Sequence, residues 1–258
     1  MKNALLIDLG GTNVRHAFFI NNTLSKISKE KISDKEFIPF ITKLLNGAES
    51  KIEYLVIAAA GPNNQGFINL TNRNLLINSS ELEATLNLKK CLLLNDWEAV
   101  AFSLNEMEKK SFLSIKANVP SNKNTLLIGP GTGLGVTLII DDQIIPTEFG
   151  NVLSATKSMM ESFGIERSEK FLSLENVLSG PGIEMLYEEK FGKKLSSEKI
   201  ITLALERNED ALFIVNNFLK TLISIIDDLV LSFTCKRVIL GGAILNSLKS
   251  ILTSEKIL

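Results

Sequence analysis

The fold is decided by two stretches that repeat one pattern, ALLIDLGGTNVRHAFFI at residues 4–20 and TLLIGPGTGLGVTLII at residues 125–140. In each, an apolar strand-forming run leads into a short turn rich in Gly and Thr, and a second strand-forming run follows. Paired glycines supply the positive φ that a tight hairpin turn requires. The sequence therefore predicts two β-hairpins with glycine-rich turns.

The segments around these hairpins alternate between the two periodicities. Short apolar runs bounded by turn-forming residues predict buried strands. Polar caps and a spacing of three to four between apolar residues predict helices. Because strands and helices alternate along the chain, we expect an α/β fold. The predicted strands cover residues 54–60, 90–94 and 237–240, and the predicted helices cover residues 80–86, 98–108, 183–191 and 214–230.

Length and composition exclude several classes of protein. The 258 residues suit one large domain or two lobes. A formal net charge of −1 lacks the basic footprint of a nucleic-acid binder. The most apolar stretch, residues 212–230, is interrupted by charged and amide side chains, and the first apolar run is too short for a signal peptide. We expect a cytoplasmic protein that binds neither membrane nor nucleic acid.

Cysteine and histidine are too scarce for several kinds of site. The two cysteines, Cys91 and Cys235, lie far apart within apolar runs, which excludes a disulfide scaffold and a Cys/His zinc site. The single histidine, His16, lies in a strand-like run, where a packed side chain is the simpler interpretation.

The glycine-rich turns suit phosphate, because small residues let backbone N–H groups approach an anion. Neither turn has the GK[ST] of a P-loop or the spacing of a dinucleotide fingerprint. Each turn carries a threonine, Thr12 or Thr132, whose hydroxyl could donate to a phosphate oxygen. Asp8, where the first strand meets its turn, could hold Mg²⁺ through water.

Five motifs together resemble the bacterial-type glucokinases of the hexokinase/actin-like ATPase superfamily. In chain order they resemble the first phosphate motif, the segment with the catalytic Asp, the second phosphate motif, a segment with a sugar-binding Glu, and the adenosine motif. They are DLGGTNVR at 8–15, LNDWEA at 94–99, GPGTGLGV at 129–136, ENVLSGPG at 175–182 and LGGAI at 240–244.

The resemblance implies a two-lobed α/β fold, actin-like and related to ribonuclease H, with a cleft between the lobes. Residues 1–105 would form the small lobe and residues 106–258 the large lobe. It also implies ATP and Mg²⁺ as cofactors, with Asp8 near the metal. The residues implied to bind the nucleotide are Asp8, Gly10, Gly11, Thr12, Asn13, Gly131, Thr132, Gly133, Gly241 and Gly242.

The implied reaction is the ATP-dependent phosphorylation of glucose at its 6-hydroxyl, with Asp96 as general base. The implied sugar ligands are Asn95, Asp96, Glu148, Asn151 and Glu175. From the residues alone, other roles stay open: Asp96 could cap the helix after it, Glu175 could be a first-turn helix acid, and Glu148 a solvated loop acid.

The chain departs from the family pattern in the sugar loop. Where the family usually has Gly-Glu-Gly-Gly-His, this chain has TEFGN at 147–151. Asn151 therefore replaces a histidine and Phe149 a glycine, and the segment after the adenosine motif is short. These differences keep two alternatives open: a kinase for another hexose, or a catalytically weak sugar- or nucleotide-binding protein. A homodimer is an expectation from the resemblance.

Overall fold

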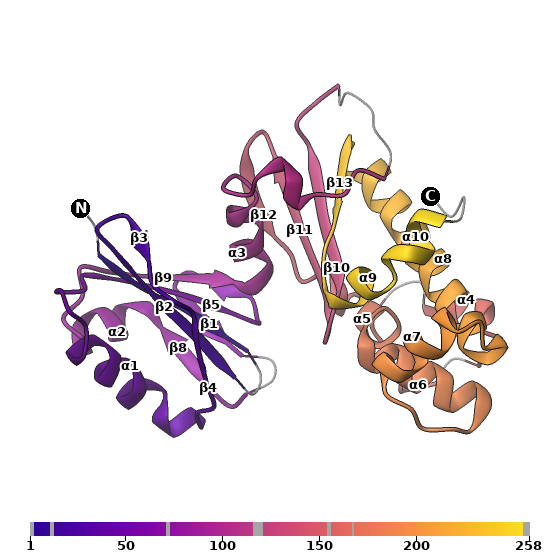
Figure 1. Cartoon of the computed structure of the whole chain (residues 1–258), viewed down its shortest axis with the longest axis horizontal. Coiled ribbons are helices and arrows are strands. Elements are labelled where there is room, and N and C mark those ends of the chain that lie inside the picture. Colours follow the sequence, from indigo (N-terminus) through magenta and orange to yellow (C-terminus); the bar gives the residue numbers. More distant parts are fainter. Residues whose placement is uncertain are drawn as a thin grey trace. The chain divides into compact units, whose positions relative to one another are not determined.

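The computed structural model describes residues 3–10, 13–70, 73–115, 121–153, 156–166 and 168–254. The chain divides into two compact units, Met1–Asn105 and Glu106–Leu258, and each is described by itself. The indigo-to-magenta part of Figure 1 is the first unit, and the magenta-to-yellow part is the second.

The first unit is built on a six-stranded sheet with the order β3-β2-β1-β5-β9, in which β4 also pairs with β2. A smaller sheet has the order β6-β7-β8. Its strands are β1 (Ala4–Leu9), β2 (Val14–Ile20), β3 (Thr23–Leu24), β4 (Ser28–Glu30), β5 (Tyr54–Ala59), β6 (Asn63–Asn64), β7 (Phe67–Asn69), β8 (Leu76–Asn78) and β9 (Lys90–Asn95). Its helices are η1 (Asp34–Glu36), α1 (Phe37–Asn46), α2 (Ser79–Thr85) and α3 (Asp96–Ser103).

The second unit has a four-stranded sheet with the order β12-β11-β10-β13. Its strands are β10 (Thr125–Pro130), β11 (Leu134–Ile140), β12 (Gln143–Pro146) and β13 (Arg237–Leu240). Its helices are η2 (Lys109–Ser111), η3 (Phe149–Asn151), α4 (Thr156–Ser162), α5 (Leu174–Val177), α6 (Gly180–Phe191), α7 (Ser197–Leu205), α8 (Glu209–Ser232), α9 (Ala243–Ser247) and α10 (Lys249–Ser254).

The two sheets repeat one arrangement around their hairpins. β1 runs antiparallel to β2 and parallel to β5, and β10 likewise runs antiparallel to β11 and parallel to β13. Both predicted hairpins are confirmed. Each unit also has its own core, made in the first unit by β1, β5, β9 and α1, and in the second by β10, β11 and the helices.

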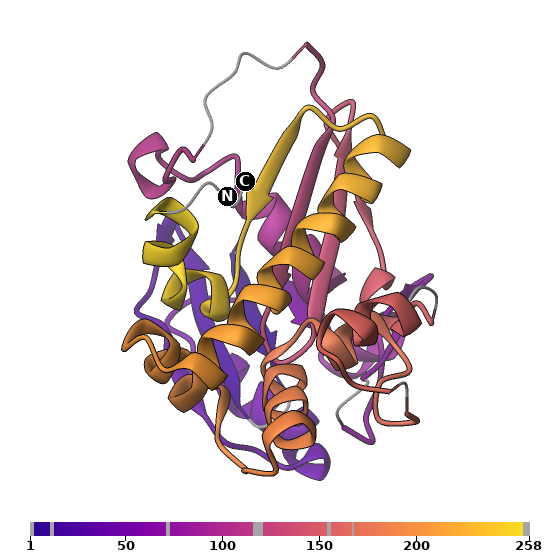
Figure 2. The same ribbon diagram turned by 90° about the vertical axis from the view of Figure 1, so that its right-hand side faces the viewer.

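The long helix α8 covers the sheet of the second unit, as Figure 2 shows. Its apolar side chains recur every three or four residues, so that one face, including Phe218 and Leu222, is buried with Leu126 and Val136 of the sheet. Asn208 caps its start by accepting a hydrogen bond from the N–H of Ala211 at 3.1 Å. None of the described helices is long and apolar enough to cross a membrane.

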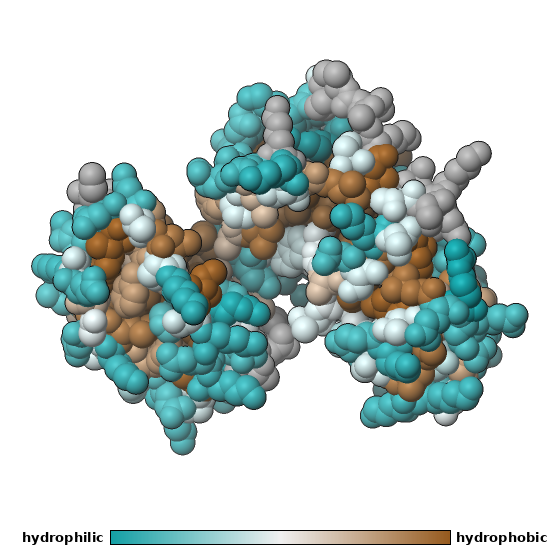
Figure 3. Space-filling view, in the orientation of Figure 1, coloured by the Kyte–Doolittle hydropathy of each residue, from teal (hydrophilic) through white to brown (hydrophobic). Residues whose placement is uncertain are grey.

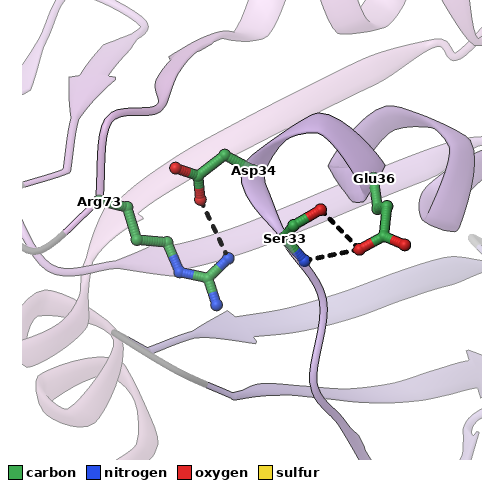
Figure 4. Close-up of polar contacts among 4 residues, drawn as sticks. All are labelled: Ser33, Asp34, Glu36 and Arg73. Carbon is green, nitrogen blue, oxygen red and sulfur yellow. Dashed lines mark hydrogen bonds and ion pairs between the residues drawn. The ribbon is translucent and has the colours of Figure 1, made fainter.

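A buried arginine ties the first unit's loops together. The side chain of Arg73 is only 5% exposed, and its Nη1 lies 3.4 Å from Oδ1 of Asp34 in η1 (Figure 4). Beside it, the N–H and Oγ of Ser33 both donate to Oε2 of Glu36, at 2.8 and 2.6 Å. The Arg73–Asp34 pair joins η1, directly before α1, to the segment that leads into β8, and the Ser33–Glu36 bonds fix the turn of η1 itself.

Polar residues cover much of each unit's surface, with apolar residues between them (Figure 3). Several exposed apolar side chains belong to strands at sheet edges, such as Leu92 of β9 and Val238 of β13. Single exposed apolar residues are ordinary on a protein surface. Both cysteines are buried, as the sequence predicts, and burial raises the pKa of the Cys91 thiol to about 12, so it stays an unreactive thiol.

All four predicted helices begin earlier than the sequence pattern indicates: α6 begins at Gly180 and α8 at Glu209, and α2 and α3 begin directly after strands. α2 begins at Ser79 and is capped by Asn78, whose Oδ1 accepts from the N–H of Ser80 at 3.0 Å, where a helix that starts at residue 80 is expected. α3 begins at Asp96 and ends at Ser103, where a helix over 98–108 is expected. In α2 and α3, the asparagine that ends the preceding strand is also the N-cap, so the helix begins at the next residue.

The positive φ expected of the turn glycines is wrong for the second turn. Among the described glycines, Gly10, Gly131 and Gly133 do not adopt the left-handed φ that favours glycine. Gly11 lies outside the described residues. The glycines of the second turn must therefore be explained by their neighbours.

Candidate active site

In the first unit, three parallel strands bring polar residues to one edge of the sheet. The register aligns Asp8 of β1 with Ala58 of β5 and Leu94 of β9. Because parallel strands end on the same side, Asp8 lies at the edge where β9 ends and α3 begins. Asn95 and Asp96 are the residues at that junction.

Asn95 is the N-cap of α3. Its Oδ1 accepts from the N–H of Trp97 at 2.9 Å and from that of Glu98 at 3.3 Å. Its Nδ2 donates to the carbonyl of Gly61 at 3.2 Å, and the side chain is buried. Glu98 completes a capping box by accepting from the N–H of Asn95 at 3.1 Å. The helix cap is thus Asn95, which leaves the carboxylate of Asp96 for another role.

Asp96 occupies the first position of α3 and is partly buried. Burial raises the pKa of its carboxyl above the ordinary value, and the negative charge of Asp8 adds to the rise. The backbone N–H of Trp97, which donates to Oδ1 of Asp96 at 2.9 Å, opposes the rise. A carboxylate with a raised pKa is a stronger base than an ordinary aspartate.

Asp8 is paired across the first hairpin with Arg15. The two residues face each other in the antiparallel register, and Nη1 of Arg15 lies 2.7 Å from Oδ2 of Asp8. Both side chains are about half exposed. Sequence reasoning did not single out Arg15, although its position directly across the hairpin from Asp8 could have revealed it.

In the second unit, the hairpin turn is held by its neighbours on both sides. The N–H of Gly131 donates to the carbonyl of Gly133 at 2.8 Å, and that of Gly180 donates to the carbonyl of Gly131 at 2.8 Å. On the other side, the N–H of Gly241 donates to the carbonyl of Ile128 at 3.0 Å. A methyl group on Gly242 would lie 2.5 Å from the carbonyl oxygen of Pro130. Neighbouring backbone therefore fixes the position of this turn.

The sugar-loop residues lie next to the same turn. η3 packs on the start of β11, where a methyl group on Gly150 would lie 2.5 Å from the carbonyl oxygen of Leu134. Nδ2 of Asn151 donates to Oε2 of Glu148 at 3.1 Å. Asn151 therefore positions Glu148, a role that its sequence position did not indicate.

Glu175 of α5 also faces this turn. Its helix is joined to the sugar loop by a hydrogen bond from the N–H of Leu174 to the carbonyl of Val152, at 3.1 Å. The structure thus gathers the predicted residues into two groups. In the first unit they are Asp8, Asn95 and Asp96, and in the second they are Gly131, Thr132, Gly133, Glu148, Asn151, Glu175, Gly241 and Gly242.

The remaining predicted residues are not placed in either group. Gly10 and Asn13 flank the first turn, where the N–H of Gly10 donates to the carbonyl of Asn13 at 3.0 Å. Gly11 and Thr12 lie outside the described residues. Gly180, which holds the second turn, lies in the quoted segment 175–182, but nothing in the sequence indicated this contact.

The residues fit a magnesium ion that arrives with a nucleotide. The described residues contain no group of three or more His, Cys, Asp or Glu side chains that could hold a resident metal. Asp8 offers a half-exposed carboxylate, with one oxygen bound by Arg15. Mg²⁺ is commonly held by one or two carboxylates together with waters and substrate phosphates.

Comparison with known proteins shows the family. The family model described as Glucokinase matches residues 5–258. The chain is 27% identical to the glucokinase of Pseudomonas paraeruginosa over 208 residues, covering 72% of this chain and 58% of that protein. It is 28% identical to the glucokinase of Helicobacter pylori strain J99 over 215 residues, covering 78% and 64%. The chain spans about three fifths of the length of the curated relatives it matches.

Solved structures show the fold. A glucokinase from an Antarctic psychrotroph superposes with a TM-score of 0.76 at 24% identity, covering all of this chain and 88% of that one. A glucokinase from Balamuthia mandrillaris in complex with glucose gives 0.74 at 20% identity, covering 99% and 86%. A ROK family glucokinase from Streptomyces griseus in complex with glucose and AMPPNP gives 0.67 at 16% identity, covering 95% and 84%.

The likeness to these structures confirms the expected α/β, actin-like ATPase fold. The match of the family model to nearly the whole chain confirms the resemblance carried by the five motifs. This chain belongs to the glucokinase family.

Proposed function

We propose that this protein is an ATP-dependent hexokinase that phosphorylates glucose at its 6-hydroxyl. The observation that carries the proposal is the Asp96 carboxylate, which is partly buried at the start of α3 with a raised pKa. Family membership supports a sugar kinase, and the named complexes of structural relatives contain glucose and an ATP analogue.

Asp96 acts as the general base. It accepts the proton of the attacking sugar hydroxyl, and its raised pKa increases its basicity at the moment of transfer. Asn95 contributes by fixing the start of α3, so that the carboxylate of Asp96 is oriented before the sugar arrives. Such positioning supplies much of the catalysis in phosphoryl transfer.

The two hairpin turns bind the phosphates of ATP. Backbone N–H groups and the hydroxyls of Thr12 and Thr132 donate to phosphate oxygens, and Gly241 and Gly242, in the segment that resembles the adenosine motif, lie beside the adenosine. Mg²⁺, held by Asp8 through water, would neutralise phosphate charge when bound. Glu148, Asn151 and Glu175 bind the sugar hydroxyls.

A panel of hexoses tests the proposal. The protein is incubated with Mg·ATP and each of glucose, mannose, fructose, galactose and N-acetylated hexosamines, and release of ADP is measured. We expect glucose to give the highest kcat/KM. Asp96→Asn is the control for contaminating kinases, because it should abolish the signal.

A kinase for another hexose is the second candidate. It is favoured by Asn151, which donates to Glu148 where the family pattern has a histidine, and by the bulk of Phe149. A higher kcat/KM for a hexose other than glucose would select it. Binding of sugar or nucleotide with no turnover of any hexose would instead indicate a binding protein.

A further inference from the structure

The turn of the second hairpin touches the carboxylate of Glu175. A methyl group on Gly133 would lie 2.5 Å from Oε2 of Glu175, well inside the 3.4–4 Å of ordinary van der Waals contact. At Gly131, in the same turn, a methyl group would meet no atom within 4 Å. Neither glycine has a left-handed φ. The space that a side chain at position 133 would need is therefore occupied by the Glu175 carboxylate.

Glu175 is free to bind a ligand. Its side chain is only partly exposed, and among the described residues its carboxylate has no hydrogen-bond or ion-pair partner. Both oxygens of this carboxylate can therefore accept a hydrogen bond from a sugar hydroxyl.

The turn and the helix of Glu175 are fixed to each other. The N–H of Gly180 donates to the carbonyl of Gly131, which joins the turn to the start of α6 directly after α5. At the other end of α5, Oδ1 of Asn176 accepts from the N–H of Ser173 at 3.0 Å and from that of Leu172 at 3.2 Å. A change in the turn at Gly133 is therefore met by the side chain of Glu175 and not by a movement of its helix.

We propose that Gly133, a residue of the nucleotide hairpin, is a positioning residue for the sugar site, because its missing side chain sets where the Glu175 carboxylate lies. The inference rests on the proposed function, in which Glu175 is a sugar ligand. An alanine at position 133 pushes aside the far end of a flexible side chain, which costs little stability. The affinity for the sugar decreases instead, because the sugar loses a hydrogen bond to the Glu175 carboxylate.

The experiment compares Gly133→Ala with Gly131→Ala, the same change two positions away in one turn. The Kd of the hexose that the unaltered protein phosphorylates is measured by calorimetry without nucleotide, beside both KM values and the thermal midpoint. We expect Gly133→Ala to raise the hexose Kd and KM about 10- to 100-fold, the loss of one hydrogen bond to a charged group. Its thermal midpoint should stay that of the unaltered protein. Gly131→Ala should leave the hexose Kd unchanged.

A double-mutant cycle tests the contact itself. Glu175→Ala should weaken hexose binding, and adding Gly133→Ala to it should weaken binding no further, because the carboxylate that the methyl group displaces is gone. Three results would overturn the inference and leave the proposed function unaffected. They are additive effects of the two changes on the hexose Kd, an unchanged hexose Kd in Gly133→Ala, and an effect of Gly133→Ala on the KM for ATP alone. If the unaltered protein neither binds nor phosphorylates any hexose, both the proposed function and this inference are wrong.

Discussion

At the scale of single residues, the carboxylate of Asp96, the proposed general base, carries a cost in stability. Burial is the largest cause of its raised pKa, and the charge of Asp8 adds to it. A group whose pKa is higher in the folded state stabilises the fold in its protonated form. That stabilisation is complete below the unfolded-state pKa and is lost as the pH rises through the folded-state pKa. At neutral pH the ionised carboxylate therefore destabilises the fold.

Asp96→Asn should accordingly raise the thermal midpoint at pH 7, because the amide mimics the protonated acid and keeps an oxygen that can accept from Trp97. The gain should shrink as the pH falls and vanish below about pH 4, near the ordinary pKa of aspartate. Thermal unfolding across this pH range measures it. A variant less stable than the unaltered protein at pH 7 would show that the carboxylate is not desolvated as described.

Thr132 gives the second residue-scale prediction. Its side chain is exposed in the second turn. Thr132→Val keeps the branched shape and removes the hydroxyl, so kcat/KM for ATP should fall by the equivalent of about 1–3 kcal/mol. Initial rates at varied ATP check this, and Thr137→Val, a buried change on the neighbouring strand, is the comparison. Wild-type kinetics in Thr132→Val would mean that the turn does not bind phosphate through this hydroxyl.

At the scale of elements, the sequence predicted features that depend on local patterns well, and it predicted features that depend on tertiary contacts poorly. The hairpins, the strands at 54–60 and 237–240 and the stop of α6 at Gly192 follow from local propensity, and the structure has them. The starts of α2 and α3 were missed because a strand-ending asparagine also caps the next helix.

In the candidate site, too, the sequence indicated local features better than contacts between distant segments. Motifs indicated its residue types, but the contact of Gly133 with Glu175 joins two segments whose approach only the fold determines. The Asn151–Glu148 hydrogen bond, in contrast, is local, because the two residues are three positions apart. A glycine-rich turn looks the same in sequence whether it needs a special φ or needs space.

The cap of α3 gives the element-scale prediction. Asn95 and Asn78 cap their helices in the same way, but Asn95 also donates to the buried carbonyl of Gly61. Asn78→Ala should lower the free energy of unfolding by about 1 kcal/mol, the usual loss of a cap. Asn95→Ala should cost about 1–3 kcal/mol more, because it leaves a buried carbonyl unpaired. Urea unfolding compares the two, and equal losses would refute the structural role given to the Gly61 bond.

At the scale of the whole molecule, each unit contains a separate hydrophobic core. Ile57, fully buried in β5, belongs to the first core. Ile57→Ala should destabilise that unit by about 2–5 kcal/mol through the cavity it leaves. Amide exchange should quicken in β1, β5 and β9 while β10 and β11 keep their protection. An equal loss of protection in both sheets would show that the two cores unfold together.

The proposed function assigns roles to residues of each unit, Asp96 in the first and Thr132 in the second. Its central claim is that Asp96 removes the proton from the sugar hydroxyl. The most direct test is single-turnover transfer of the labelled γ-phosphate of ATP to glucose, comparing the unaltered protein with Asp96→Asn at equal nucleotide occupancy. We expect transfer to be slower by about two to four orders of magnitude in the variant, with the Kd for ATP unchanged. Transfer at the rate of the unaltered protein would contradict the account.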